Sequence, residues 1–124
     1  MTVARELHRV IGFSLAGCWA LLLVAGVSLA LRKRDAGRRY WGLLGLLEVA
    51  LGVQVLAGLA VLAAGGRAPL LHYLYGAVVP ALLLVEAHLL GPRLKQLPNH
   101  LLFTIAAAVN LLLSVRALVT GLGS

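Results

Sequence analysis

The chain has a single cysteine, Cys18, and little polar sequence outside its short connectors. One cysteine excludes an internal disulfide and the paired-thiol redox chemistry of the membrane enzymes that form disulfides. Cys18 lies within a long apolar stretch, where a lone cysteine is most simply a small buried apolar residue. A strong catalytic motif is also missing, so we do not expect this chain to be an enzyme on its own.

Four long apolar stretches occupy most of the chain. Hydrophobic residues make up 61% of the 124 residues and the mean hydropathy is +0.98, as in membrane proteins. A helix needs about 20 residues to cross the hydrocarbon core of a bilayer. The stretches predict helices at about 10–31, 41–64, 70–90 and 100–119 in a single domain, 1–124. Because the connectors are short, we expect an all-α fold: an integral membrane four-helix up-down bundle.

Positive charge is distributed unevenly among the connectors. Eleven Lys and Arg against four Asp and Glu give a net charge of +7. The cations crowd the first connector and recur in the third: Arg32, Lys33, Arg34, Arg38, Arg39, Arg93 and Lys95. Positively charged loops stay in the cytoplasm. This predicts a plasma (inner) membrane protein of prokaryotic type with both termini outside. The cations also attract anionic lipid, and nucleic-acid binding is not expected.

Glycine, proline and asparagine predict details of the helices. Gly45 and Gly52 share one face of the second helix, and small residues let helices approach closely in a bilayer. We therefore expect this face, which also holds Glu48, to contact another helix. Pro80 lies inside the third helix, where its missing N–H predicts a kink. Asn99 is the predicted N-cap of the fourth helix.

Two histidines are predicted at the outer end of the bundle. Ionisable side chains inside a bilayer are expensive, which makes their positions informative. With a rise of about 1.5 Å per residue, His8 and His72 lie at the outer ends of two different helices. Two neutral imidazoles from different helices are what axial ligation of a b-type haem requires. Arg9 and Arg116 are the predicted partners of the haem propionates, and Tyr75 is predicted to line the haem edge.

Further polar residues lie at the inner end and near the midplane. They are Glu48, Glu86, His88, His100, Gln54 and Asn110. The inner carboxylates and histidines fit either a proton or cation site or neutral groups that hydrogen-bond between helices. We expect interhelical hydrogen bonds from Gln54 and Asn110. At about 100° per residue, His88 points about 160° away from His72, so a second haem at the inner end is disfavoured.

Two short motifs carry a resemblance to known haem proteins. The run Glu6-Leu7-His8-Arg9 followed by Gly12 resembles helix starts in haem A synthases, which are built from four-helix membrane halves. In that family, histidine pairs ligate haem near the outer surface. The run His72-Tyr73-Leu74-Tyr75-Gly76 is similar to the His-x-x-x-Gly helix starts of small four-helix cytochromes b. The resemblance implies haem iron bound by His8 and His72.

Three functions remain open from the sequence. The first is a haem-binding membrane bundle that acts in electron transfer or haem handling. The second is a non-catalytic accessory subunit of a larger, respiratory-type membrane complex, which contacts other membrane subunits or itself through its glycine- and alanine-rich helices. The third is a small proton-linked transporter that uses Glu48 and Glu86. Small multidrug transporters carry a glutamate in their first membrane helix, and the apolar run at 11–31 has no acid, which disfavours that kind of transporter.

Overall fold

The computed structural model of the protein describes residues 2–67 and 70–122, and within these ranges it consists of helices and short connectors. The all-α class is confirmed. The predicted third helix is one continuous run in which a π-helical turn separates two α-helical parts. The elements are α1 (Thr2–Leu31), α2 (Arg38–Ala63), α3 (Leu70–Tyr73), the π-helical η1 (Leu74–Val78), α4 (Val79–Leu90), the 3-10 turn η2 (Gly91–Arg93) and α5 (Leu101–Leu122).

Three helical stretches are long and apolar enough to cross a membrane: Arg5–Leu31, Arg38–Ala63 and Leu74–Arg93. The fourth helix, α5, has a shorter apolar stretch, Leu101–Ala117. Large apolar side chains lie exposed on the outside of the helices, as Leu56 (67%) and Leu112 (72%) show. Such an apolar exterior suits lipid and not water. The fold is therefore that of a membrane protein, and the fourth crossing stays a prediction.

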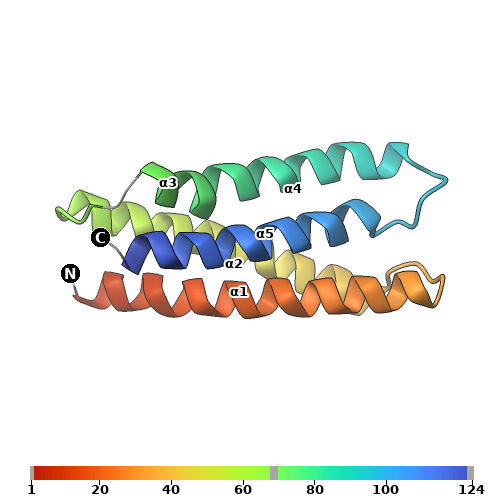
Figure 1. Ribbon diagram of the computed structural model, residues 1–124, viewed down its shortest axis with the longest axis horizontal. Coiled ribbons are helices and arrows are strands. Elements are labelled where there is room, and N and C mark those ends of the chain that lie inside the picture. Colours follow the sequence, from red (N-terminus) through yellow and green to blue (C-terminus); the bar gives the residue numbers. More distant parts are fainter. Residues whose placement is uncertain (1, 68–69, 123–124) are drawn as a thin grey trace.

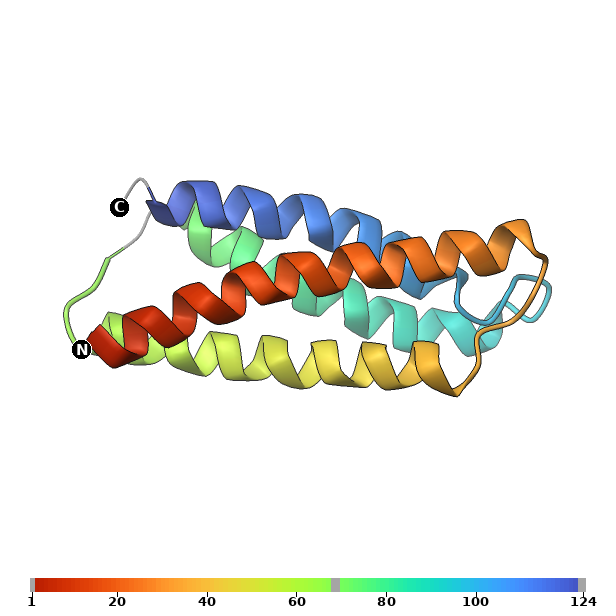
Figure 2. The ribbon, with the colours of Figure 1, turned by 90° about the horizontal axis from the view of Figure 1, so that it is seen from below.

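The long helices lie side by side and consecutive ones run in opposite directions, with both termini at the same end (Figures 1 and 2). α1 packs against both α2 and α5, and α5 packs against α4. Among the described residues, α2 comes close to the third helical run at η1 and not along α4. The first and third connectors therefore share the end of the bundle opposite the termini, here named the connector end.

α1 begins at Thr2, well before the start predicted near residue 10. The residues ahead of that point, including Glu6 and Leu7, contain no glycine or proline and are compatible with a helix. Tertiary contacts of His8 with α2 then favour extension of the helix, as described below. His8 is thus held on a regular helix.

The closest approach between α1 and α5 depends on Gly26. A Cβ built on Gly26 would lie 2.1 Å from Thr104 Oγ1 and 2.8 Å from Thr104 Cβ. Thr104 Oγ1 is hydrogen-bonded to Tyr40 Oη and to His100 Nδ1, both at 2.9 Å. Tyr40, Thr104 and His100 are all buried. The missing side chain at residue 26 therefore lets α1 cover a polar network that joins α2 to α5.

The glycines on the exposed face of α2 behave differently from Gly26. No heavy atom lies within 4 Å of a Cβ built on Gly42, Gly45 or Gly52. Glu48 on this face does contact another helix, through His88 of α4, but the three glycines contact no other helix among the described residues. Leu47 and its neighbours are the cause: the large apolar side chains of α2 are buried on the opposite face, and burial of large groups contributes more than contact of small ones.

Pro80 coincides with the irregular part of the third helical run. The N–H of Val79 donates to the carbonyl of Leu74, five residues back, which defines the π-helical turn. Pro80 has no N–H to offer to the preceding turn. The backbone adjusts at the predicted kink by including one extra residue in this turn. η1 directly follows His72 and Tyr73.

Asn99 joins two connectors and does not cap α5. Its Oδ1 accepts the N–H of Ala36 (2.8 Å), its Nδ2 donates to the carbonyl of Ala36 (3.3 Å), and its own N–H donates to Asp35 Oδ1 (3.2 Å). α5 begins at Leu101, so Asn99 lies too far ahead to cap it. The predicted cap is replaced by a clip that holds the first and third connectors together.

α1 and α2 each end in a hydrogen-bonded turn of the same type, the Schellman motif. The N–H groups of Lys33 and Arg34 donate to carbonyls in the last turn of α1 (3.1 and 2.9 Å), and those of Gly65 and Gly66 do so at the end of α2 (3.1 and 2.9 Å). The residue after the helix is left-handed in both turns, with φ of 54° at Lys33 and 98° at Gly65. Glycine adopts this conformation freely and lysine does not.

We expect Gly26→Ala to lower the free energy of unfolding by about 1 to 3 kcal/mol, because overpacking a core has that effect. Gly17 lies on the same helix with no heavy atom within 4 Å of an added Cβ. Gly17→Ala should be neutral or stabilising by up to about 1 kcal/mol from helix propensity. Unfolding of both variants in detergent micelles, followed by circular dichroism, makes the comparison. Equal effects at the two glycines would contradict the close approach of α1 and α5.

Opposite changes at the two Schellman turns should have opposite effects. Lys33→Gly should raise the free energy of unfolding, and Gly65→Ala should lower it, each by about 1 kcal/mol, because a left-handed residue with a Cβ is strained by that amount. Chemical unfolding in mixed micelles measures both changes. Destabilisation by Lys33→Gly would show that the lysine side chain contributes more than the backbone strain removes.

Candidate functional site

His8 and His72 lie together at the end of the bundle that carries the termini. Their ring centroids are 5.9 Å apart and the rings meet edge to face, at 72°. His8 comes from α1 and His72 from α3, elements that are far apart in the sequence and lie at the same end in Figure 1. The structure thus brings together the two residues that the sequence proposed as ligands.

The ring of His72 is oriented by the last helix. His72 Nδ1 lies 2.7 Å from the backbone carbonyl of Ala117 on α5. A carbonyl only accepts hydrogen bonds, so Nδ1 carries the proton. The neutral ring then has its lone pair on Nε2. Histidines that bind metals have this arrangement, in which a backbone carbonyl fixes the tautomer and leaves the other nitrogen for the metal.

His8 is held by α2. Gln54 Nε2 donates a 2.7 Å hydrogen bond to the backbone carbonyl of His8. Gly58 lies one turn further along α2, and a Cβ built there would be 3.0 Å from Cε1 of the His8 ring. The ring occupies space that a larger residue at 58 would fill. His8 Nδ1 and Gln54 Oε1 are buried without a hydrogen-bond partner in the described chain.

Neither predicted propionate partner shows a bond to these histidines. Arg9 forms an exposed ion pair with Glu6, at 2.6 Å, on its own helix. Arg116 is exposed and directly precedes Ala117, whose carbonyl binds His72. Tyr75 is partly buried within η1. All three belong to the same end of the bundle; Arg9 directly follows His8, and Arg116 directly precedes Ala117.

Glu48 and His88 form a second polar pair, toward the connector end. Glu48 Oε2 lies 2.7 Å from His88 Nε2, across α2 and α4. The side chains are 33% and 52% exposed, respectively. Glu86 is exposed on α4, and Glu48 contacts His88, two residues after Glu86 on the same helix. The carboxylate pair proposed for a transporter is replaced by a carboxylate–imidazole pair.

His88 and His100 are connected by aromatic rings and not by direct contact. His88 packs on Phe103 (4.8 Å), Phe103 on Trp41 (5.2 Å), and Tyr40 on both Trp41 (5.2 Å) and His100 (5.5 Å). His100 is completely buried, and its Nε2 has no hydrogen-bond partner in the described part of the chain. His88 and His100 therefore belong to two different local structures.

Asn110 departs from its expected role. It is completely buried on α5, yet neither Nδ2 nor Oδ1 has a hydrogen-bond partner among the described residues. Its neighbours on the buried stripe of the same helix, Ala106 and Ala107, offer no polar side chain. The predicted interhelical hydrogen bond is made by Gln54 and not by Asn110.

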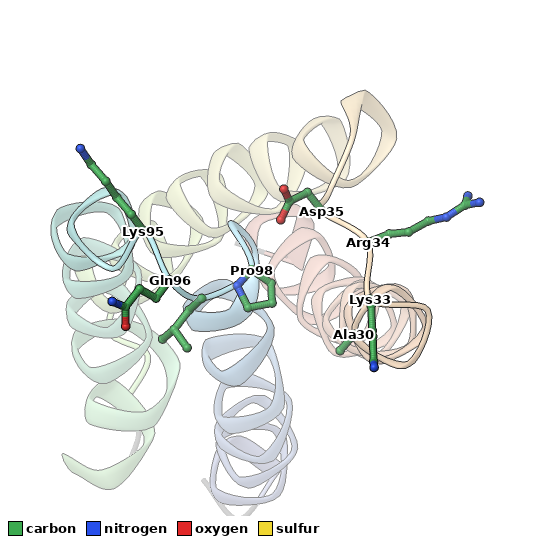
Figure 3. Close-up of a pocket in the computed structure, with 8 residues that line it drawn as sticks. Ala30, Lys33, Arg34, Asp35, Lys95, Gln96 and Pro98 are labelled. Carbon is green, nitrogen blue, oxygen red and sulfur yellow. The ribbon is translucent and has the colours of Figure 1, made fainter.

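A pocket of about 380 Å³ lies between the first and third connectors. Its lining includes Lys33, Arg34, Asp35 and Lys95. The three cationic side chains point in different directions and do not converge on a common point (Figure 3). This pocket therefore lacks the arrangement that would bind one anionic group.

Within residues 2–67 and 70–122, no three His, Cys, Asp or Glu side chains gather as a metal cluster. Haem needs only one or two axial ligands from the protein, and the His8–His72 pair meets that number. Comparison of the chain with family models, with curated proteins and with solved structures finds no match.

We expect Gly58→Leu to displace the His8 ring, because the added side chain would occupy its position. Gly45→Leu is the matched control on the same helix, where no heavy atom lies within 4 Å of the added Cβ. Nuclear magnetic resonance of the protein in micelles should show the nuclear Overhauser contact between the rings of His8 and His72. The contact should disappear in Gly58→Leu and persist in Gly45→Leu. Its persistence in both would contradict the placement of His8 against α2.

Proposed function

We propose that the chain is a four-helix membrane bundle, with both termini outside the plasma membrane, that binds one b-type haem between His8 and His72. The single observation that carries the proposal is the 5.9 Å separation of two imidazoles from different helices at one end of an apolar bundle. Haem bound there would pass one electron at a time, for electron transfer, or would be held for delivery. The sequence resemblance to haem A synthases and small cytochromes b points the same way.

Three features of this end fit a bound haem. His72 donates its Nδ1 proton to the carbonyl of Ala117, which fixes the tautomer that has its lone pair on Nε2. His8 Nδ1 is buried without a hydrogen-bond partner in the described chain, and such an atom requires an explanation such as a ligand or water. The ring of His8 lies against Gly58 of α2, which fixes its position. A neighbouring helix holds each histidine, α2 for His8 and α5 for His72, and apolar helices surround the pair.

The charged residues would contribute to orientation of the cofactor. Arg116 is an exposed cation near the site, and guanidinium groups bind carboxylates such as propionates in a bidentate manner. Arg9 is engaged by Glu6 and would have to exchange that partner for a propionate. We therefore assign the larger share of propionate binding to Arg116.

An accessory subunit is the second candidate, and the exposed glycine face of α2 favours it. Gly42, Gly45 and Gly52 have no heavy atom within 4 Å of an added Cβ. A partner helix could approach closely there. This role would leave the histidines without an individual function, whereas the haem proposal depends on two of them.

The haem proposal predicts a Soret band, with sharp α and β bands after reduction by dithionite, in full-length protein purified from haem-supplemented cells. His8→Ala and His72→Ala should each reduce haem content about tenfold or more, since loss of even a hydrogen-bond partner of a metal ligand lowers metal affinity by about that factor. His88→Ala is the control, because its half-exposed ring contacts Glu48 and Phe103 instead. Folded protein without a Soret band would reject haem and leave the accessory role. Equal loss in His88→Ala would reject the assigned ligands.

A further inference from the structure

A groove of about 390 Å³ runs between α2 and α4 on the outside of the bundle. It exists because α2 approaches the third helical run at η1 and not along α4. All but two of its lining residues are apolar or glycine. The lining is Glu48, Leu51, Gly52, Val55, Leu56, Ala77, Ala81, Leu84, Val85 and His88.

The groove has the dimensions and surface of a site for a hydrocarbon chain. On α2 it extends from Glu48 to Leu56, about 12 Å at the helical rise per residue. Gly52, Ala77 and Ala81 have no side chain or only a methyl group, so they take up little of the space in the groove. The polar pair Glu48–His88 lies at the end of the groove that is nearer the connectors, since α2 starts there and α4 ends there.

Cations flank the same end of the groove. Arg38 and Arg39 begin α2, and Arg93 and Lys95 follow α4; all four are exposed. Glu48 is already paired with His88, and Asp35 accepts the N–H of Asn99 in the clip between the connectors. Positive charge therefore lies beyond the polar end of the apolar groove, toward the connector end of the bundle.

We infer that this groove binds one acyl chain of an anionic phospholipid, of the phosphatidylglycerol class, with its phosphate at Arg38, Arg39, Arg93 and Lys95. Basic pockets between membrane helices on the cytoplasmic side bind anionic lipid headgroups for this reason. The groove supplies the apolar half of the recognition and the cations supply the charged half. The lipid also fills the space between two helices that are joined at one end by the Glu48–His88 pair and whose backbones lie apart. The inference does not depend on haem.

The test is lipid binding to the full-length protein in detergent, measured by native mass spectrometry. Phosphatidylglycerol and phosphatidylcholine with the same acyl chains are compared. The expected result is a retained single phosphatidylglycerol with about tenfold or greater preference, since each cation near a lipid surface contributes about fivefold. Equal retention of the two lipids would overturn the inference.

Two pairs of variants separate the groove from general surface charge. Ala81→Leu fills the groove and should abolish retention, whereas Ala60→Leu, exposed on α2 outside the lining, should leave it unchanged. Arg38→Gln with Arg93→Gln should weaken phosphatidylglycerol binding about 25-fold. Arg32→Gln with Arg34→Gln removes the same charge at the end of α1 and should weaken it far less. Retention in Ala81→Leu, or equal losses in the two charge variants, would show attraction to the surface alone and overturn the inference.

Discussion

The packing of α1 against both α2 and α5 is the constraint on which the rest of the structure depends. At the connector end, Gly26 lets α1 lie directly over Thr104, which holds Tyr40 of α2 and His100 together. Toward the termini, the same helix places His8 against Gln54 and Gly58 of α2. One helix therefore joins both its neighbours at two levels. α4, by contrast, packs on α5, and its side facing α2 remains open.

The histidine site and the groove both follow from this asymmetry. His8 lies beside His72 because α2 holds His8 of α1 through Gln54 and Gly58, and α5 holds the ring of His72 through the carbonyl of Ala117. The groove remains because α2 is already buried on the face carrying Leu44 and Leu47. On its other face, Glu48 contacts His88 of α4, while the exposed glycines contact no helix in the described chain. For α2 to close the groove by packing along α4, it would have to turn its large apolar residues away from α1, and buried apolar area would be lost.

The sequence predicts the helices well because the length of an apolar stretch depends only on consecutive residues. It predicts His8 and His72 as a pair because both lie at helix ends of equal depth, and depth follows from residue count. It does not predict Gln54 and Ala117 as the groups that orient them. Those contacts depend on which helices are adjacent, and short connectors leave that open. The carbonyl of Ala117 is a backbone group, which any residue type would provide.

The wrong predictions share one physical cause, which is that small and polar residues have several possible partners. Asn99 could cap its own helix or bind the backbone of another connector, and the three hydrogen bonds it makes with the first connector satisfy more groups than one cap would. Glycine lets helices approach, but only where the opposite helix offers a matching residue, as Thr104 does for Gly26. Asn110 offers both a donor and an acceptor, and the described residues around it supply neither. A buried amide in that state is expensive, so the centre of the bundle is the place where an ordered water or a bound group would add most to stability.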